Sequence, residues 1–224
     1  SLSGLLAQQS VLMVSGQDPS SINPGDQAIL SALQNSGYTV TVKGGPNTPT
    51  SAADANGVDL VFISATADPS GIGNTFANVA TPVIVSQSYI YDDMGMTAHT
   101  AQHDYGIAQN ARWAQITAPN HPIAQSLSGL EALTTARADL RWGDPSNDAD
   151  KIARLGLYGS RYAVFAYDAG DNMVGMQAPA VRIGLHMDTW TSTHSTNAGW
   201  TLFNQAVSYA TNSSSSNCTA DAGT

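Results

Sequence analysis

Two serines at the end of an apolar run could supply a nucleophile. In "TPVIVSQSYIYDDMGM", Ser86 and Ser88 directly follow the β-branched residues of the run. A serine attacks a substrate when a base lies within hydrogen-bond reach and a third group orients that base. Late in the chain, "LHMD" and "STHS" provide histidines and an aspartate that could serve in this way. The candidate catalytic residues are therefore Ser86, Ser88, His186, Asp188 and His194.

A noncatalytic interpretation of the same stretch is favoured. The turn lacks the "GxSxG" elbow that forces a serine into an exposed, strained position. The residue between the serines, Gln87, carries an amide, which does not titrate. We therefore expect Ser86 and Ser88 to satisfy backbone groups where a strand ends, and a small serine hydrolase or esterase stays as the alternative.

Three predicted strand ends could together line a ligand site. They read "VSGQDPSSINPGD", "SATADPSGIG" and "SQSYIYDD". The first two are rich in Gly, Ser and Asp-Pro, so their backbones can approach a ligand closely. In an open α/β sheet, ligands bind beyond the carboxyl ends of the strands. The phosphate motifs "GxGxxG" and "GxxxxGK[ST]" are absent from the chain. The predicted ligand-binding residues are Ser15, Ser64, Ser86, Gln87, Tyr91, Asp92 and Asp93.

The adjacent carboxylates Asp92 and Asp93 have two interpretations. They could bind a cation or accept hydroxyl groups of a sugar, and their like charges would raise one pKa. Alternatively, one of them caps a helix beginning near "DMGM" while the other faces water, and we favour this capping role. Sugar C–H faces stack on flat aromatic rings, for which the loop candidates are Tyr89, Tyr91, Tyr105 and Trp190.

Metal ligation receives weak support. "DPSNDAD" gathers oxygen ligands of the kind that calcium prefers, but it lacks the Gly and the distal Glu of an EF-hand loop. A polar turn is the favoured interpretation, and no metal or other cofactor is predicted. His99 and His103 stand four apart without the glutamate of a zinc protease helix. We expect His121, before Pro122, to be a turn residue whose ring bonds to backbone. The weak metal candidates are Asp144, Asn147, Asp148 and Asp150.

The elements that must position these residues alternate between strand and helix along the chain, and the pattern loosens after residue 96. Apolar runs at 10–16, 58–66, 82–88 and 181–187 predict buried strands, and periodic segments at 23–38, 72–80 and 197–211 predict helices. Continuous apolar strands separated by helices indicate a parallel sheet covered on both faces. The sequence therefore predicts an α/β fold with a doubly wound, mostly parallel, flavodoxin-like sheet and an antiparallel β excursion in the second half.

Length and composition set the domain organisation. The 224 residues, of which 42% are hydrophobic, are expected to form one α/β domain over residues 1–211, followed by a serine-rich linker or tail over 212–224. The net charge of -9 argues against nucleic-acid and anionic-membrane partners. The lone Cys218 excludes an internal disulfide. Low charge and many small polar residues are typical of secreted bacterial proteins, so we expect a periplasmic or extracellular location.

Several motifs in the chain resemble a known family. These are "NPGD" (23–26), "YDDMGM" (91–96), "WGDP" (142–145), "APAVRIG" (178–184), and "HPI" (121–123) followed by "SLSGL". With "VRIGLHMD" leading into "GWTLFNQAVSYA", residues 10–211 resemble ThuA-like domains of the class I glutamine amidotransferase-like fold, as found in secreted multimodular bacterial proteins. The resemblance implies a flavodoxin-like sheet and an association with polysaccharide-handling proteins, without an established reaction. That fold would hold a cysteine nucleophile near positions 86–88, where this chain has "SQS".

The sequence thus leaves two functions open. The favoured one is a noncatalytic accessory module of a secreted, polysaccharide-active bacterial protein, binding a polysaccharide or a neighbouring module of the same chain at the carboxyl ends of the strands. The absence of the cysteine and of the serine elbow supports this choice. The alternative is the small serine hydrolase.

Overall fold

A computed structural model describes residues 8–157 and 159–220, with side chains as far as residue 213. Short segments of secondary structure alternate through the first half, and strands dominate the second. The strands are β1 Ser10–Val14, β2 Thr39–Lys43, β3 Leu60–Ile63, β4 Val83–Val85, β5 Tyr105–Ala111, β6 Trp113–Ile116, β7 Gly129–Ala132, β8 Ala138–Gly143, β9 Asp150–Leu155, β10 Tyr162–Tyr167 and β11 Arg182–Leu185. The helices are α1 Pro24–Asn35, η1 Ala52–Ala55, α2 Pro69–Ile72, η2 Ser88–Ile90, α3 Thr189–Thr193 and α4 Asn197–Ala220.

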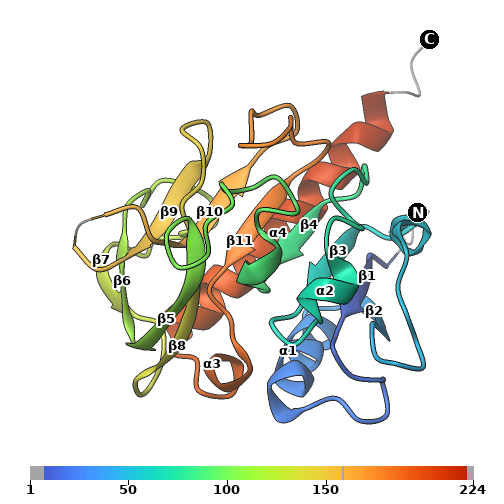
Figure 1. The fold of residues 1–224 in the computed structure, drawn as a ribbon, viewed down its shortest axis with the longest axis horizontal. Helices are drawn as coiled ribbons and strands as arrows, with labels where there is room; N and C mark the ends of the chain where they lie inside the picture. The colour runs from blue at the N-terminus through green and yellow to red at the C-terminus, as the bar shows by residue number, and fades with distance from the viewer. Residues whose placement is uncertain (1–7, 158, 221–224) are drawn as a thin grey trace, which may run out of the picture.

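The described strands form one mixed sheet, and the prediction of a mostly parallel, doubly wound flavodoxin-like sheet is wrong. The order is β2-β1-β3-β4-β11-β10-β9-β6-β7, with β8 paired to both β10 and β5. Only the pairs β2–β1, β1–β3, β3–β4 and β4–β11 are parallel. All pairs made by β5 to β10 are antiparallel. The antiparallel part is therefore the larger portion of the sheet, as Figure 1 shows on the side of β5 to β9.

Both faces of β1, β3, β4 and β11 are buried, since neighbouring residues along these strands lie on opposite faces of the sheet. Val11 and Met13 of β1 pack in one hydrophobic cluster, together with residues of α1 and α4. Leu12 and Val14 pack in the other, with Ala55 of η1 and residues of α2 and η2. This alternation follows from the two-residue period of a strand, and burial on both sides explains why these strands have continuous apolar sequences.

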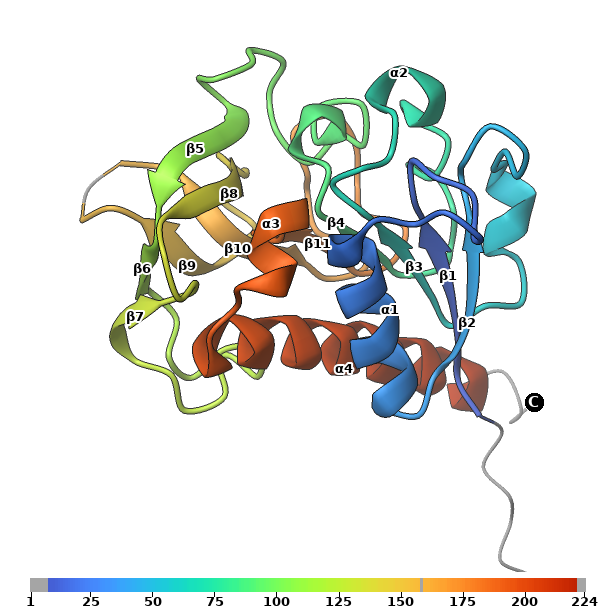
Figure 2. The ribbon, with the colours of Figure 1, turned by 90° about the horizontal axis from the view of Figure 1, so that it is seen from below.

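Long helices cover only one of these two faces. Figure 2 shows α1 and α4 on one side of the sheet and the short α2 on the other. The helix predicted over 72–80 is absent, because α2 ends at Ile72 and Gly73 adopts φ 44°. A positive φ is readily accessible to glycine and ends an α-helix. The second face is instead closed by turns and one-turn helices.

The last helix is longer than the sequence predicted. Helix α4 continues to Ala220, through the serine-rich segment that was expected to be a linker, while residues 221–224 lie outside the described part of the chain. The hydroxyl of Thr196 accepts a hydrogen bond from the Gly199 N–H at 3.2 Å and caps its start. None of the described helices is both long enough and apolar enough to cross a membrane.

Helix α1 brings a carboxylate to the edge of the sheet. Asn23 caps it by accepting a hydrogen bond from the Asp26 N–H at 3.0 Å, and Pro24 occupies the first turn. Because α1 follows β1 directly, the first turn lies beside the carboxyl ends of β1 and β3. Asp26, in that turn, is 1% exposed.

Candidate functional site at the carboxyl ends of the parallel strands

Asp26 is the centre of a buried hydrogen-bond cluster. Its Oδ2 accepts hydrogen bonds from Ser15 Oγ at 2.6 Å and Thr66 Oγ1 at 2.7 Å. Its Oδ1 accepts one from Ser64 Oγ at 2.5 Å. The structure therefore brings together two predicted ligand residues, Ser15 and Ser64, but it uses their hydroxyls to hold a carboxylate. Hydrogen bonds to an ionised acceptor are stronger than neutral ones, so this cluster fixes α1 against β1 and β3.

Glycine allows the loops of β1 and β3 to approach at this point. The Gly16 N–H donates a hydrogen bond to Thr66 Oγ1 at 3.0 Å. A Cβ atom at Gly16 would lie 2.0 Å from the carbonyl oxygen of Thr66. The glycine after Ser15 is thus needed for close backbone packing, and its small size serves the Asp26 cluster rather than an approaching ligand.

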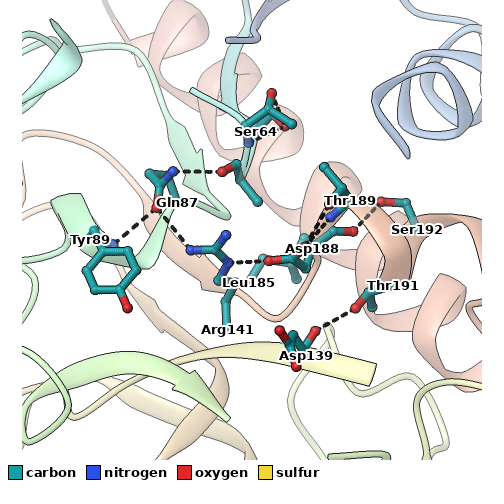
Figure 3. Close-up of polar contacts among 12 residues, drawn as sticks. Ser64, Gln87, Tyr89, Asp139, Arg141, Leu185, Asp188, Thr189, Thr191 and Ser192 are labelled. Atoms are coloured by element: carbon teal, nitrogen blue, oxygen red, sulfur yellow. Dashed lines mark hydrogen bonds and ion pairs between the residues drawn. The ribbon is translucent and has the colours of Figure 1, made fainter. Parts of the chain in front are cut away.

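Gln87 and Arg141 form a second polar group. The Gln87 amide donates to the carbonyl oxygens of Ala65 at 2.7 Å and Ala67 at 2.8 Å, and its Oε1 accepts a hydrogen bond from Arg141 Nη1 at 3.1 Å. The other side of the guanidinium pairs with Asp188, with 2.7 Å between Nε and Oδ2 (Figure 3). This chain of contacts ties the loop after β3 to β4, β8 and the residue that precedes α3.

The hydroxyls of the two candidate nucleophiles lack hydrogen-bond partners among the described residues. Ser86 Oγ and Ser88 Oγ are buried, and neither makes a hydrogen bond with any residue that the structure describes. Both ring nitrogens of His186 are likewise buried and unpaired. Burial lowers the pKa of His186 to about 3, so its ring is neutral near pH 7. A base must reach the nucleophile through a hydrogen bond, and these residues do not form that pair in this arrangement.

The other candidate catalytic groups have structural partners. Asp188 pairs with Arg141, and its second oxygen accepts hydrogen bonds from the backbone and hydroxyl of Thr189 at the start of α3. The His194 ring stacks on Trp190, with centroids 3.6 Å apart and planes 8° apart. The His194 Nδ1 lies 2.8 Å from Thr193 Oγ1. Asp188 therefore orients Arg141 instead of a histidine.

The remaining predicted ligand residues differ in exposure. Tyr91 is fully buried, and its hydroxyl donates to the Val85 carbonyl oxygen at 3.1 Å. Asp92 Oδ2 accepts a hydrogen bond from the Tyr105 hydroxyl at 3.2 Å, and burial with the nearby Asp92 charge raises the pKa of Tyr105 to about 12. Asp93 is exposed. Partial burial of its carboxyl group is the main reason that its pKa is raised, and the neighbouring Asp92 charge is the second. No helix begins at "DMGM", since residues 91–95 form turns.

The weak metal candidates point to separate partners. Asp148 Oδ2 accepts a hydrogen bond from Asn172 Nδ2 at 2.7 Å, and Asn147 Oδ1 accepts one from Lys151 Nζ at 3.4 Å. Asp150 Oδ2 lies 3.4 Å from His121 Nε2. Within residues 8–157 and 159–220, no three His, Cys, Asp or Glu side chains are grouped so that they could hold a metal ion. The turn prediction for His121 is confirmed, since its Nδ1 accepts a hydrogen bond from the Ile123 N–H at 3.2 Å.

Sequence reasoning missed Asp26 and Arg141 as members of this site. Asp26 was visible within "NPGD", but an aspartate in a first helical turn is ordinarily explained by the helix dipole. Arg141 lies between Leu140 and Trp142 on β8, a basic residue in an otherwise buried strand end. A rare arginine inside an apolar segment is a signal of a buried partner, although it does not identify Gln87 or Asp188 as that partner.

Comparisons with known proteins assign no family. Neither the models of protein families nor the curated proteins contain a match to this chain. Among solved structures, the crystal structure of SMU.1228c is similar with a TM-score of 0.47 and 8% sequence identity, covering 89% of this chain and 100% of that chain. A likeness of this degree carries neither fold nor function over to the chain.

Proposed function

We propose that this chain is a noncatalytic binding module of a secreted, polysaccharide-active bacterial protein, and that it binds glycan at the surface over the carboxyl ends of the parallel strands. The polar composition and the family resemblance of the sequence support the location and the association. The observation that carries the noncatalytic part is that three charged groups at this edge, Asp26, Arg141 and Asp188, are held in internal hydrogen bonds.

Aromatic side chains around the Arg141–Asp188 pair suit a sugar ligand. The guanidinium carbon of Arg141 lies 5.9 Å from the centre of the half-buried Tyr89 ring. Helix α3, which Asp188 caps, presents Trp190, which is 43% exposed and is held by its stack on His194. A ring fixed by a neighbour loses little side-chain entropy when a ligand binds, and one free face remains for sugar C–H groups.

The exposed tryptophans give a matched test of this proposal. Native electrophoresis through gels containing xylan, hydroxyethyl cellulose, laminarin or starch should retard the wild-type chain with at least one polysaccharide. Trp190→Ala should weaken that retardation about tenfold or more, because a buried aromatic anchor contributes about 2 kcal/mol to binding. Trp113→Ala is the control, since Trp113 is 47% exposed on β6 and lies beside an arginine. Unretarded migration in every gel, or equal loss in both variants, would contradict the proposal.

The serine hydrolase alternative has a direct test. A fluorophosphonate modifies a serine only when a neighbouring base activates it. Because the hydroxyls of Ser86 and Ser88 make no hydrogen bond with the described part of the chain, we expect the intact mass to be unchanged after incubation with the reagent. Stoichiometric labelling at either serine would make the chain a hydrolase and overturn its noncatalytic assignment.

A further inference from the structure

A cavity of about 760 Å³ lies at the opposite edge of the parallel strands. Its lining comes from the residues that precede β3, β4 and β11, from the end of β10 and from one face of α4. Small-molecule sites have volumes of about 300–1,000 Å³, so this cavity has the size of a ligand site. The lining residues are Val58, Ala80, Thr81, Pro82, Pro122, Asp168, Ala169, Ala180, Val181, Gln205, Ser208, Tyr209, Asn212 and Ser213.

One wall of the cavity is apolar because a buried arginine binds its carbonyl groups. Arg182 Nη1 donates to the carbonyl oxygens of Thr81 at 3.1 Å, Val181 at 3.1 Å and Ala180 at 3.4 Å. Its Nη2 donates to two further carbonyls in the same loop region, at 2.6 and 3.1 Å. With their carbonyls turned to the guanidinium, Ala180 and Val181 contribute small apolar side chains to the wall, and the arginine fixes the wall in place.

The facing wall carries a carboxylate and an aromatic ring. Tyr209 of α4 donates a hydrogen bond from its hydroxyl to Asp168 Oδ1 at 2.7 Å. Asp168 is exposed, and its Oδ2 accepts no hydrogen bond from the part of the chain that the structure describes. The side of Tyr209 is supported by the His121 ring, with 5.0 Å between ring centres. Asp168 is the only charged residue among the described lining residues.

We propose that this cavity binds a small organic ammonium ion, with the nitrogen at the Asp168 carboxylate and the apolar stem along Pro82, Ala180 and Val181. An ammonium group forms a charge-assisted hydrogen bond with a carboxylate and is attracted to the face of a tyrosine ring. The net charge of -9 favours approach of a cation over that of an anion. The Arg182 charge behind the apolar wall is surrounded by five carbonyl oxygens, whose negative ends face it.

Three probes that share a cyclohexyl ring and differ in the charge of the attached group separate charge from apolar contact. Cyclohexylammonium, cyclohexanol and cyclohexanecarboxylate should be titrated into the isotope-labelled full chain while backbone amide chemical shifts are followed. We expect cyclohexylammonium to produce saturable shifts at Thr81, Val181 and Tyr209, with an affinity about tenfold above that of cyclohexanol. Cyclohexanecarboxylate should bind more weakly than the alcohol. Equal affinity of the three probes, or saturable shifts elsewhere in the chain only, would overturn the proposal.

Two substitutions locate the interaction. Asp168→Asn keeps an acceptor for the Tyr209 hydroxyl and should reduce the affinity for cyclohexylammonium to that for cyclohexanol. The control Asp139→Asn removes one negative charge from an exposed position on β8 and should leave both affinities unchanged. Ser208→Trp, on the lining face of α4, should weaken both ligands by occupying the cavity. If Asp168→Asn still prefers cyclohexylammonium over cyclohexanol, the carboxylate does not bind the ammonium group and the proposal is refuted. If Trp190→Ala still binds cyclohexylammonium, this site is independent of the glycan site at the other edge.

Discussion

At the carboxyl ends of β1, β3 and β4, side chains hydrogen-bond to one another, whereas at the amino ends of β4 and β11 a single arginine binds main-chain carbonyls. At the carboxyl edge, Asp26 accepts hydrogen bonds from the hydroxyls of Ser15 and Ser64, and Arg141 donates one to the amide oxygen of Gln87. At the amino edge, Arg182 donates hydrogen bonds to main-chain carbonyl oxygens. Charged side chains are therefore paired with other side chains at the first edge, whereas at the second edge the Asp168 carboxylate faces a cavity.

This difference shows that the position of an edge in an α/β sheet does not decide which edge holds a cavity. Ligands are expected beyond the carboxyl ends of parallel strands, where helix starts and loops converge. Here Asp26, in the first turn of α1, fills part of that place with its hydrogen-bond cluster. The cavity forms instead where α4 passes the starts of β4 and β11 and the end of β10. The two edges can be compared by removing the charged group that organises each.

The largest effect is expected from Arg182→Met at the amino edge. Arg182 is fully buried, burial lowers its pKa to about 10, and five carbonyl oxygens surround its terminal nitrogens. Methionine fills much of the volume but leaves these carbonyls without their donor, so we expect the free energy of unfolding to fall by about 3–5 kcal/mol. Urea denaturation followed by circular dichroism measures this change.

Arg137→Met provides the control for that experiment. Arg137 is exposed and donates one hydrogen bond, to the Asn110 carbonyl oxygen at 2.9 Å. We expect its replacement to change the free energy of unfolding by less than about 0.5 kcal/mol, as for most surface substitutions. A similar small loss in Arg182→Met would mean that the amino edge does not depend on the guanidinium.

A smaller loss is expected from Asp26→Asn at the carboxyl edge. The substitution conserves shape, but it replaces one acceptor oxygen with an NH₂ group that faces hydroxyl donors. Since Asp26 accepts hydrogen bonds from Ser15, Ser64 and Thr66, we expect a loss of about 2–4 kcal/mol in the free energy of unfolding. The control is Asp18→Asn, at a half-buried loop position that accepts hydrogen bonds from Asn47 and Thr48. If the free energy of unfolding falls equally in the two variants, burial of the Asp26 cluster does not increase its contribution to stability.

The sequence predicted the parallel strands better than the sheet as a whole, for a physical reason. Strands β1, β3, β4 and β11 are buried on both faces, so their apolar sequences identify them without knowledge of their neighbours. Strand β5 includes exposed residues at 109–110 and a register shift, so no clear period marks it. The dominance of antiparallel pairs depends on long-range pairing between such weakly marked segments.

The sequence could predict where the candidate site lies, but it could not predict which residues contact one another there. Chain order alone suggests that Ser15, Ser64 and Gln87 lie near one edge, because each follows a buried strand. The partners that determine their chemistry come from elsewhere, with Asp26 on a helix and Arg141 on a distant antiparallel strand. The cavity at the other edge is lined by several segments that carry no shared motif, so the sequence contains no local signal for it.

The smallest of the three effects should come from His186, and it depends on pH. Burial without a hydrogen-bond partner lowers the pKa of His186 to about 3 in the folded chain, against about 6.5 when unfolded. Between these values the unfolded chain binds more protons, so stability falls as pH decreases through this window. From pH 7 to pH 5 the histidine should account for a loss of about 2 kcal/mol in the free energy of unfolding.

His186→Leu should remove this part of the acid sensitivity while keeping an apolar group in the buried position. Urea denaturation at pH 7 and pH 5 gives the loss for each chain, and the loss in His186→Leu should be smaller than in wild type by about 2 kcal/mol. His99→Gln, at a histidine that is 80% exposed, should retain the wild-type loss. If His186→Leu and wild type lose the same stability, the imidazole has a partner or contacts water. The carboxyl edge would then be open, and a base beside Ser86 or Ser88 would again be possible.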